Sequence, residues 1–278
     1  MVIMSTYTLV DDGSDIPHYE FSFAGRDLKL IQHPGSILSV ESLSIGSYEA
    51  PLPIILMAAI SRTKGAFLDV GANIGIYSIL ATKTRNCLQV YAFEPLSEAR
   101  ELLTANLRIN GTISQANISE VALSDNDGIA TLHLPDPGHG LLETSASLEA
   151  GFKDVVNTIQ VATRTLDSMK FSMPISVVKA DIEGHEAAFL RGASRTLAAD
   201  RPLVFAEMLS GASKNFFGVS KMMRDLEYIC FRMRPDVVIY TEIVVADKGW
   251  NYAFIPREKV LLFQDCCRGH DIEMLRPY

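Results

Sequence analysis

The chain has 278 residues and a formal net charge of −8, and 48% of its residues are hydrophobic. This length and apolar content suffice to bury a full core, so we expect one large domain, or one domain with a small annex. The acidic balance argues against a nucleic-acid partner, because such partners are bound through Lys and Arg that neutralise phosphates.

Membrane, export and disulfide signals are absent from the sequence. The apolar run at residues 52–60 is too short to span a bilayer, so we expect no membrane partner. Residues 1–15 lack the basic head and long apolar core of a signal peptide. The cysteines have no metal-type spacing, so we expect reduced thiols in a cytoplasmic protein; they are Cys87, Cys230, Cys266 and Cys267.

Residues 1–62 are expected to form an N-terminal annex ahead of a main domain at 63–278. Alternating aromatic residues within 19–30 predict one or two strands, and the apolar run at 52–61 predicts a buried helix. Glu49 lies just ahead of that helix and is a candidate cofactor-binding residue. An acid at a helix start also has an ordinary role, which is to balance the helix dipole.

The motif that organises the main domain is an apolar run that ends in Asp69 and is followed by Gly71 and Gly75. It predicts a strand, a tight loop and a helix N-terminus, where glycines let a ligand lie against the backbone. A dinucleotide fingerprint would place glycines at Asn73 and Ile76, and there is no Gly-Lys-Ser/Thr for a P-loop. The loop therefore favours a cationic or hydroxyl-rich ligand such as S-adenosylmethionine. The alternative is an ordinary strand-to-helix turn.

The next predicted strand supports a nucleotide site. It covers residues 89–93 and ends in Glu94 and Pro95, about 20 residues after the glycine loop, where an acid can hold ribose hydroxyls. A helix at 97–110 and a third strand at 118–123 follow. The segment 135–151 is then a long loop of the kind that often covers a site.

Strands and helices alternate through most of the chain, which predicts an α/β fold with a doubly wound, mainly parallel sheet. A buried strand at 174–180 ends in a dense group of ionisable residues: Lys179, Asp181, Glu183, His185 and Glu186. Charged groups are seldom buried, and ligands bind beyond the carboxyl ends of strands in such sheets. We therefore expect this group and the glycine loop at one edge.

Three interpretations of the group remain open. Asp181 or His185 is a general base, with its pKa set by Lys179. Alternatively Asp181, Glu183 and His185 bind a divalent metal, or the acids cap the following helix. We favour the first interpretation and assign no metal ligand.

With these motifs in place, the chain resembles the FkbM family of S-adenosylmethionine-dependent methyltransferases. The resemblance covers about half of the chain and omits residues 1–45 and 257–278. Its matching segments are residues 69–75 with Tyr77 and Ser78, 92–95, Asn106 and Asn110, 122–125 with Gly128, 165–167, 179–186, Arg201 and Pro202 before Glu207, and 251–256.

The resemblance implies a class I methyltransferase sheet, Rossmann-like, with seven strands and the last one antiparallel. It also implies that Gly71, Asn73 and Gly75 approach the methionine end, Glu94 the ribose, and residues 122–124 the adenine. The full set of candidate cofactor-binding residues is Glu49, Asp69, Gly71, Asn73, Gly75, Glu94, Pro95, Ala122, Leu123, Ser124 and Asp181. The candidate catalytic residues are Asp181 and His185, with Lys179 and Glu183 in support.

Members of that family usually methylate a hydroxyl on a sugar, polyketide or other secondary metabolite. We therefore predict O-methylation of a small hydroxylated acceptor by in-line displacement. The alternatives are N-methylation of a small-molecule amine and a non-catalytic S-adenosylmethionine-binding regulatory subunit. A nicotinamide oxidoreductase is disfavoured by Asn73 and Ile76. The candidate assembly is a homodimer.

Overall fold

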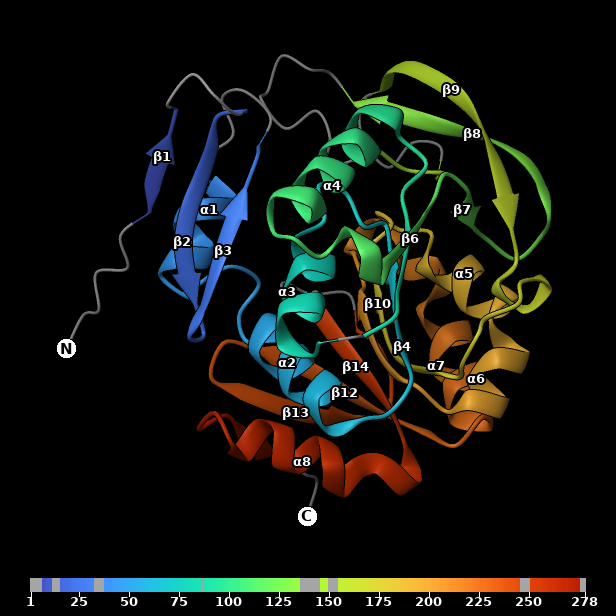
Figure 1. Cartoon of the computed structure of the whole chain (residues 1–278). Coiled ribbons are helices and arrows are strands. Elements are labelled where there is room, and N and C mark those ends of the chain that lie inside the picture. Colours follow the sequence, from blue (N-terminus) through green and yellow to red (C-terminus); the bar gives the residue numbers. More distant parts are fainter. Residues whose placement is uncertain are drawn as a thin grey trace.

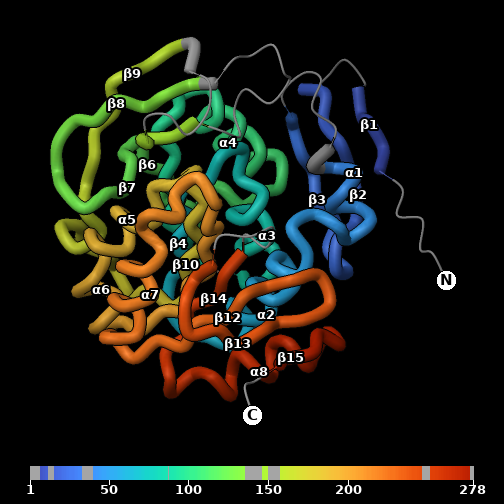
Figure 2. Tube along the Cα trace, turned by 180° about the vertical axis from the view of Figure 1, so that it is seen from behind, coloured from blue at the N-terminus to red at the C-terminus, as the bar shows by residue number. Residues whose placement is uncertain are grey.

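The computed structural model describes residues 7–11, 16–32, 38–86, 88–135, 146–149, 155–245 and 251–275. Its centre is a twisted sheet with helices on both faces (Figure 1). Two smaller sheets stand above it on opposite sides of the molecule, as both views show (Figures 1 and 2).

Within the described residues the main sheet has nine strands, in the order β15-β13-β12-β14-β11-β10-β4-β5-β6. These strands are β4 (Ala66–Val70), β5 (Val90–Phe93), β6 (Ala116–Ser119), β10 (Ile175–Ala180), β11 (Leu203–Glu207), β12 (Tyr228–Arg234), β13 (Val237–Thr241), β14 (Asn251–Pro256) and β15 (Glu273–Leu275). β4 and β10 are buried along their whole length, as expected for central parallel strands that helices cover on both faces.

The strand directions confirm the predicted doubly wound, mainly parallel sheet. β6, β5, β4, β10 and β11 run parallel, and β14 lies antiparallel between β11 and β12. Those are the seven strands that the family resemblance implies. The sheet continues past them, because β13 pairs with β12 and β15 pairs with β13.

The helices divide between the two faces. On one face are α2 (Leu52–Arg62), α3 (Ile76–Thr84), α4 (Ser97–Ile109) and α8 (Val260–Arg268), and on the other are α5 (Glu186–Gly192), α6 (Ser194–Asp200) and α7 (Phe216–Asp225). Each face has its own apolar core, one with Phe67 and Phe263 and the other with Phe189 and Phe254. The α2 helix lies within the predicted annex boundary, yet it packs on α3, α8, β10 and β11.

A small sheet of three strands covers one end of the carboxyl edge. It contains β7 (Ala122–Leu123), β8 (Gly128–Pro135) and β9 (Val155–Arg164), in the order β7-β9-β8. The single strand predicted at 118–123 is therefore wrong. The chain leaves the main sheet after Ser119, and Ala122 then pairs with Thr163 of β9.

The annex has a three-stranded antiparallel sheet and one helix: β1 (Thr8–Val10), β2 (His18–Phe23), β3 (Arg26–Leu30) and α1 (Leu38–Ser44). Asn106 of α4 holds it in place, because its side chain accepts from the Ile31 N–H at 2.6 Å and donates to the Ile31 carbonyl at 3.0 Å. Asn110 makes the same pair of bonds with Lys29. The annex strands thus share one apolar core with the main domain.

None of the helices that the structure describes is long and apolar enough to cross a membrane. Cys230, Cys266 and Cys267 are buried and free, whereas Cys87 is outside the described residues. Most of the loop predicted at 135–151 also lies outside them. Its segment 146–149 is described and bridges to β8 through Ser147 and His133.

Candidate functional site

The glycine loop after β4 lies directly against the loop after β10. Gly71 has a φ of +73°, and a Cβ on it would lie 1.9 Å from the carbonyl oxygen of Asp181. Its N–H and that of Ala72 both donate to the Phe93 carbonyl at 3.0 Å, which ties the loop to the end of β5. A side chain at position 71 would therefore separate the two loops.

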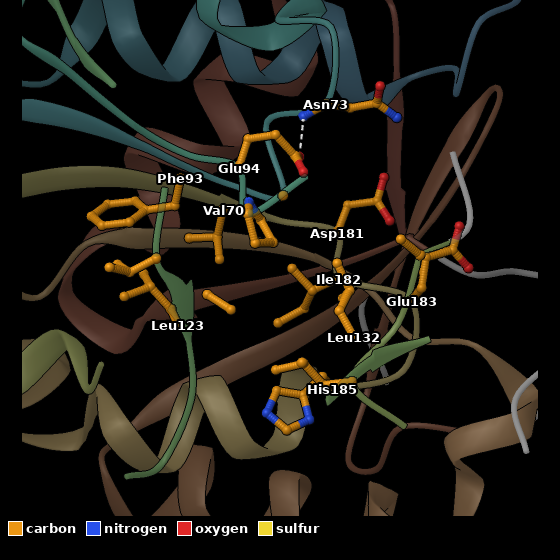
Figure 3. A pocket seen from close by; sticks show the side chains of 16 residues that line it. Val70, Asn73, Phe93, Glu94, Leu123, Leu132, Asp181, Ile182, Glu183 and His185 are labelled. Carbon is orange, nitrogen blue, oxygen red and sulfur yellow. Dashed lines mark hydrogen bonds between the residues drawn. The ribbon is translucent and has the colours of Figure 1, made fainter. Parts of the chain in front are cut away.

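A cavity opens beyond the carboxyl ends of β4, β5 and β10 (Figure 3). It contains about 640 Å³ of space, part of which is open solvent. Its wall consists of Val70, Gly71, Asn73, Phe93, Glu94, Pro95, Val121, Ala122, Leu123, Leu132, Ala146, Leu148, Asp181, Ile182, Glu183 and His185. The edge at which ligands bind in open α/β sheets thus carries the cavity.

Glu94 supplies the carboxylate on the β5 side of this cavity. Its Oε2 accepts from the Asn73 N–H at 2.8 Å, as Figure 3 shows, and its Oε1 accepts from the Leu96 N–H at 2.9 Å. Burial raises the pKa of this carboxyl to about 7, against the effect of those two bonds. Both oxygens keep lone pairs for hydroxyl donors of a ligand.

The neighbouring part of the wall is apolar. Ala122 and Leu123 of β7 lie there with Phe93 and with Leu132 of β8 (Figure 3). Pockets for small molecules are lined mainly by hydrophobic side chains, so this apolar surface suits the face of a flat heterocycle.

His185 closes the cavity on the side of α5, and both of its ring nitrogens have partners within the protein. Nδ1 lies 2.9 Å from Glu149 Oε1, and Nε2 lies 2.9 Å from Ser124 Oγ. The Ser147 hydroxyl donates to the Glu183 carbonyl at 2.7 Å, so the segment 146–149 is tied to the loop after β10. Both nitrogens of His185, the predicted alternative base, thus have protein partners in this arrangement.

Asp181 stands where the cavity meets a second, buried group of polar residues. The Nζ of Lys179 donates to its Oδ2 at 2.9 Å and lies 4.6 Å from the centre of the Tyr77 ring. Lys179 is only 4% exposed. Burial opposes its charge, but Asp181, Glu49 and Asp69 outweigh burial and hold its pKa above the usual value. Asp181 therefore faces a permanent cation.

The model of the FkbM methyltransferase domain matches residues 69–230, which is more than half of the chain. The chain belongs to the FkbM methyltransferase family. This is the S-adenosylmethionine-dependent methyltransferase family that the sequence motifs predicted. No curated protein matches it.

Several solved structures are similar in fold. Methyltransferase FkbM from Methylobacillus flagellatus KT is 15% identical with a TM-score of 0.46, over 79% of this chain and 55% of that one. This chain therefore spans about half of that protein. The O-methyltransferase TomG from Streptomyces achromogenes, in complex with SAM, is 11% identical with a TM-score of 0.45, over 74% and 80% of the two chains. A tRNA (uracil-54, C5)-methyltransferase from Pyrococcus abyssi is 15% identical with a TM-score of 0.43, over 85% and 43%.

The residues present fit S-adenosylmethionine. Gly71 lines the cavity and lets its loop lie against the loop after β10, a carboxylate at Glu94 suits the ribose hydroxyls, and Asp181 and Glu183 suit the positive charges of the methionine end. When it is bound, S-adenosylmethionine supplies an electrophilic methyl group on its sulfonium. This FkbM protein contributes the glycine loop, the acids and the apolar wall.

The predicted cofactor residues do not all lie in the wall of the cavity. Gly71, Asn73, Glu94, Pro95, Ala122, Leu123 and Asp181 do. Asp69 instead is 1% exposed and accepts from the Ser78 hydroxyl at 2.7 Å beneath α3. Gly75 begins α3 with a φ of +92° and packs on Leu103, and Ser124 is held by His185. These residues shape the loops behind the wall.

Glu49 also lies outside the wall, in the buried polar group. The Tyr77 hydroxyl donates to its Oε2 at 2.7 Å, and Glu49 has an unusual φ of +43°. Burial, together with Asp181, raises the pKa of its carboxyl. Glu49 thus belongs with Lys179 and Asp181 in the buried polar group.

Three acidic residues lie close to the site. The sequence reasoning had placed Glu186 in the ionisable group after the strand at 174–180, but it gave Glu149 and Glu207 no role in the site. Glu149 faces His185, Glu207 faces Asp181, and Glu186 accepts from the N–H groups of Ile182 at 3.0 Å and Gly184 at 3.3 Å. Glu207 ends a strand just as Asp181 follows one, which is a signal that sequence reading could have used. Glu149 had no such signal. Among the described residues, no group of three or more His, Cys, Asp or Glu is arranged to hold a metal ion.

Proposed function

We propose that this methyltransferase acts on a hydroxyl oxygen of a small molecule and that Asp181 is the base. The observation that carries the proposal is the place of Asp181: its carboxylate forms part of the cofactor cavity and is paired at 2.9 Å with a buried lysine. A carboxylate held by a fixed cation stays ionised at neutral pH, so it is ready to take a proton.

The proposed roles follow from these contacts. Lys179 orients Asp181 and keeps it charged. Glu183 lies in the same wall, with a φ of +54° that Gly184 continues at +100°, so the loop places its side chain beside Asp181 (Figure 3). His185 positions Ser124 and Glu149 and exchanges no proton with the acceptor.

Two effects account for the catalysis that we propose. Alignment of acceptor and methyl in the cavity can supply roughly 7 to 11 kcal/mol of barrier reduction. A base at the acceptor adds about 10²- to 10⁴-fold. Removal of the Asp181 charge should therefore lower turnover by the second factor, and by more than it weakens cofactor binding.

The test is transfer of a labelled methyl group from S-adenosylmethionine to a panel of hydroxylated metabolites and glycosides, each with a matched amine. We expect hydroxyl acceptors to be methylated, and Asp181→Asn to lower kcat about 10²- to 10⁴-fold. The control is Asp225→Asn, in an exposed pair with Lys221 at the end of α7. Methylation of the amines alone would establish N-methylation instead. If Asp181→Asn loses cofactor binding but keeps turnover per bound cofactor, Asp181 is not the base.

A further inference from the structure

A second acid, Glu207, lies beside Asp181 at the end of the neighbouring strand β11. In the parallel register of β10 and β11, Ala180 lies opposite Ala206, so Asp181 and Glu207 leave the sheet side by side. Side chains alternate between the two faces along each strand, so Asp181 and Glu207 lie on the same face of the sheet as Lys179. The side chain of Glu207 lies within hydrogen-bonding reach of the Asp181 carboxylate.

The charges around this pair favour one retained proton. Lys179 is the cation that faces it from β10, while Glu183, Glu49 and Tyr48 face it from the loop after β10 and from the segment before α2. From β14, the residue opposite Glu207 is Asn251, which is not ionisable. Two adjacent carboxylates that share one lysine cannot both be charged at low cost.

Burial, and after it the charge of Asp181, raises the pKa of Glu207 to about 10. A protonated carboxyl can donate one hydrogen bond. Asp181 already accepts from Lys179, so two donors would hold its carboxylate.

Resting on the proposed function, we propose that Glu207 is a positioning residue for the methyl transfer, which keeps its own proton and donates a hydrogen bond that holds Asp181 ionised and oriented in the cavity wall. In the step itself, the acceptor O–C bond forms as the C–S bond of the sulfonium breaks. The acceptor O–H bond breaks at the same time, and its proton goes to Asp181. Glu207 exchanges no proton in the step.

The first experiment measures the retained proton with no acceptor present. Infrared difference spectra of wild type against Glu207→Gln, recorded from pH 7 to 11, should show a protonated-carboxyl band that is lost in the variant and disappears in wild type near pH 10. The matched control is Glu101→Gln, an exposed glutamate of α4. Absence of the band at pH 7 in wild type would overturn the inference.

The second experiment measures the pH dependence of kcat with the hydroxylated acceptor that the panel identifies as best. Glu207→Gln keeps a hydrogen-bond donor, so we expect its kcat to stay within about threefold of wild type. The fall of kcat at acid pH, the acid limb, should be unchanged in this variant. The fall at alkaline pH, which wild type should show as Glu207 ionises, should be absent. Glu207→Ala removes the donor, so its acid limb should move to higher pH by about one unit and its kcat should fall at least about tenfold.

The outcomes separate this inference from the proposed function. A wild-type kcat and acid limb in Glu207→Ala, with Asp181→Asn still inactive, would overturn the role of Glu207 alone. Full activity in both Asp181→Asn and Glu207→Ala would overturn the proposed base as well. If Glu207→Ala does not fold, Glu207→Gln decides, because only a proton held on Glu207 makes the alkaline limb differ between wild type and that variant.

Discussion

Glu186 makes the stability of this protein depend on pH, and Glu186→Gln should remove that dependence. The side chain is 1% exposed, and burial raises the pKa of its carboxyl to about 8, from an ordinary value of 4.5. An acid whose pKa is raised by folding contributes stability that is present below the unfolded pKa and is lost as pH rises through the folded pKa. The loss therefore falls between about pH 4.5 and pH 8.

The size of the effect follows from the shift. At about 1.4 kcal/mol for each pKa unit, Glu186 should cost wild type about 3 kcal/mol of unfolding free energy between pH 5.5 and pH 8.5. Glutamine keeps an oxygen that can accept from the Ile182 and Gly184 N–H groups, and it cannot ionise. The variant should therefore gain about 3 kcal/mol relative to wild type over this interval.

The assay is urea unfolding of both proteins at the two pH values. Only the difference between the proteins is compared, because Glu94 and Glu207 also have raised pKa values and contribute equally to both. Glu101→Gln, at an exposed position of α4, is the matched control and should show no pH-dependent difference. A difference between wild type and Glu186→Gln that is the same at both pH values would refute the reasoning.

Three further changes test the site and its support. Gly71→Ala should abolish measurable S-adenosylmethionine binding in calorimetry, because its Cβ would lie 1.9 Å from the Asp181 carbonyl and would push the two loops of the cavity wall apart. Gly218→Ala, in open space, should bind normally, and equal binding by both would show that the close contact of the two loops is not needed for binding. Wild type should bind the cofactor up to about tenfold more tightly at pH 8 than at pH 6, because ionised Glu94 is the better hydroxyl acceptor, and Glu94→Gln should lack this dependence. Asn106→Ala leaves three buried backbone groups without partners and should cost on the order of 3 to 5 kcal/mol in urea unfolding; a loss below about 1 kcal/mol would show that water replaces the side chain.

Local sequence was enough to predict the two buried strands and the two loops that carry the site. An apolar run before Gly71, and another before Asp181, read as buried strands because only such runs can lie between two layers of helices. Parallel strands present their carboxyl ends at one edge, so the two loops were expected to meet there, and a Cβ on Gly71 would overlap the Asp181 carbonyl. The ends of elements were predicted less well, as the strand at 118–123 shows.

Contacts between distant segments could not be predicted from the sequence. The partners of His185 are Ser124 and Glu149, which are 61 and 36 residues away in the chain, and only the folded structure brings them to its two nitrogens. Those contacts are the reason for our proposal that His185 positions other residues. Without them, a histidine next to a cluster of acids is a reasonable candidate for a base.

The family, the parallel sheet and the edge that carries the candidate site could be predicted from the sequence alone, because apolar periodicity and glycine conformation are local properties of the chain. Tertiary structure alone decided the charge states at that edge. Lys179 is buried only because β4, α3 and the residues before α2 enclose it, and Glu207 faces Asp181 only because β11 pairs with β10. Burial and neighbouring charges set pKa values, and both depend on which segments pack together.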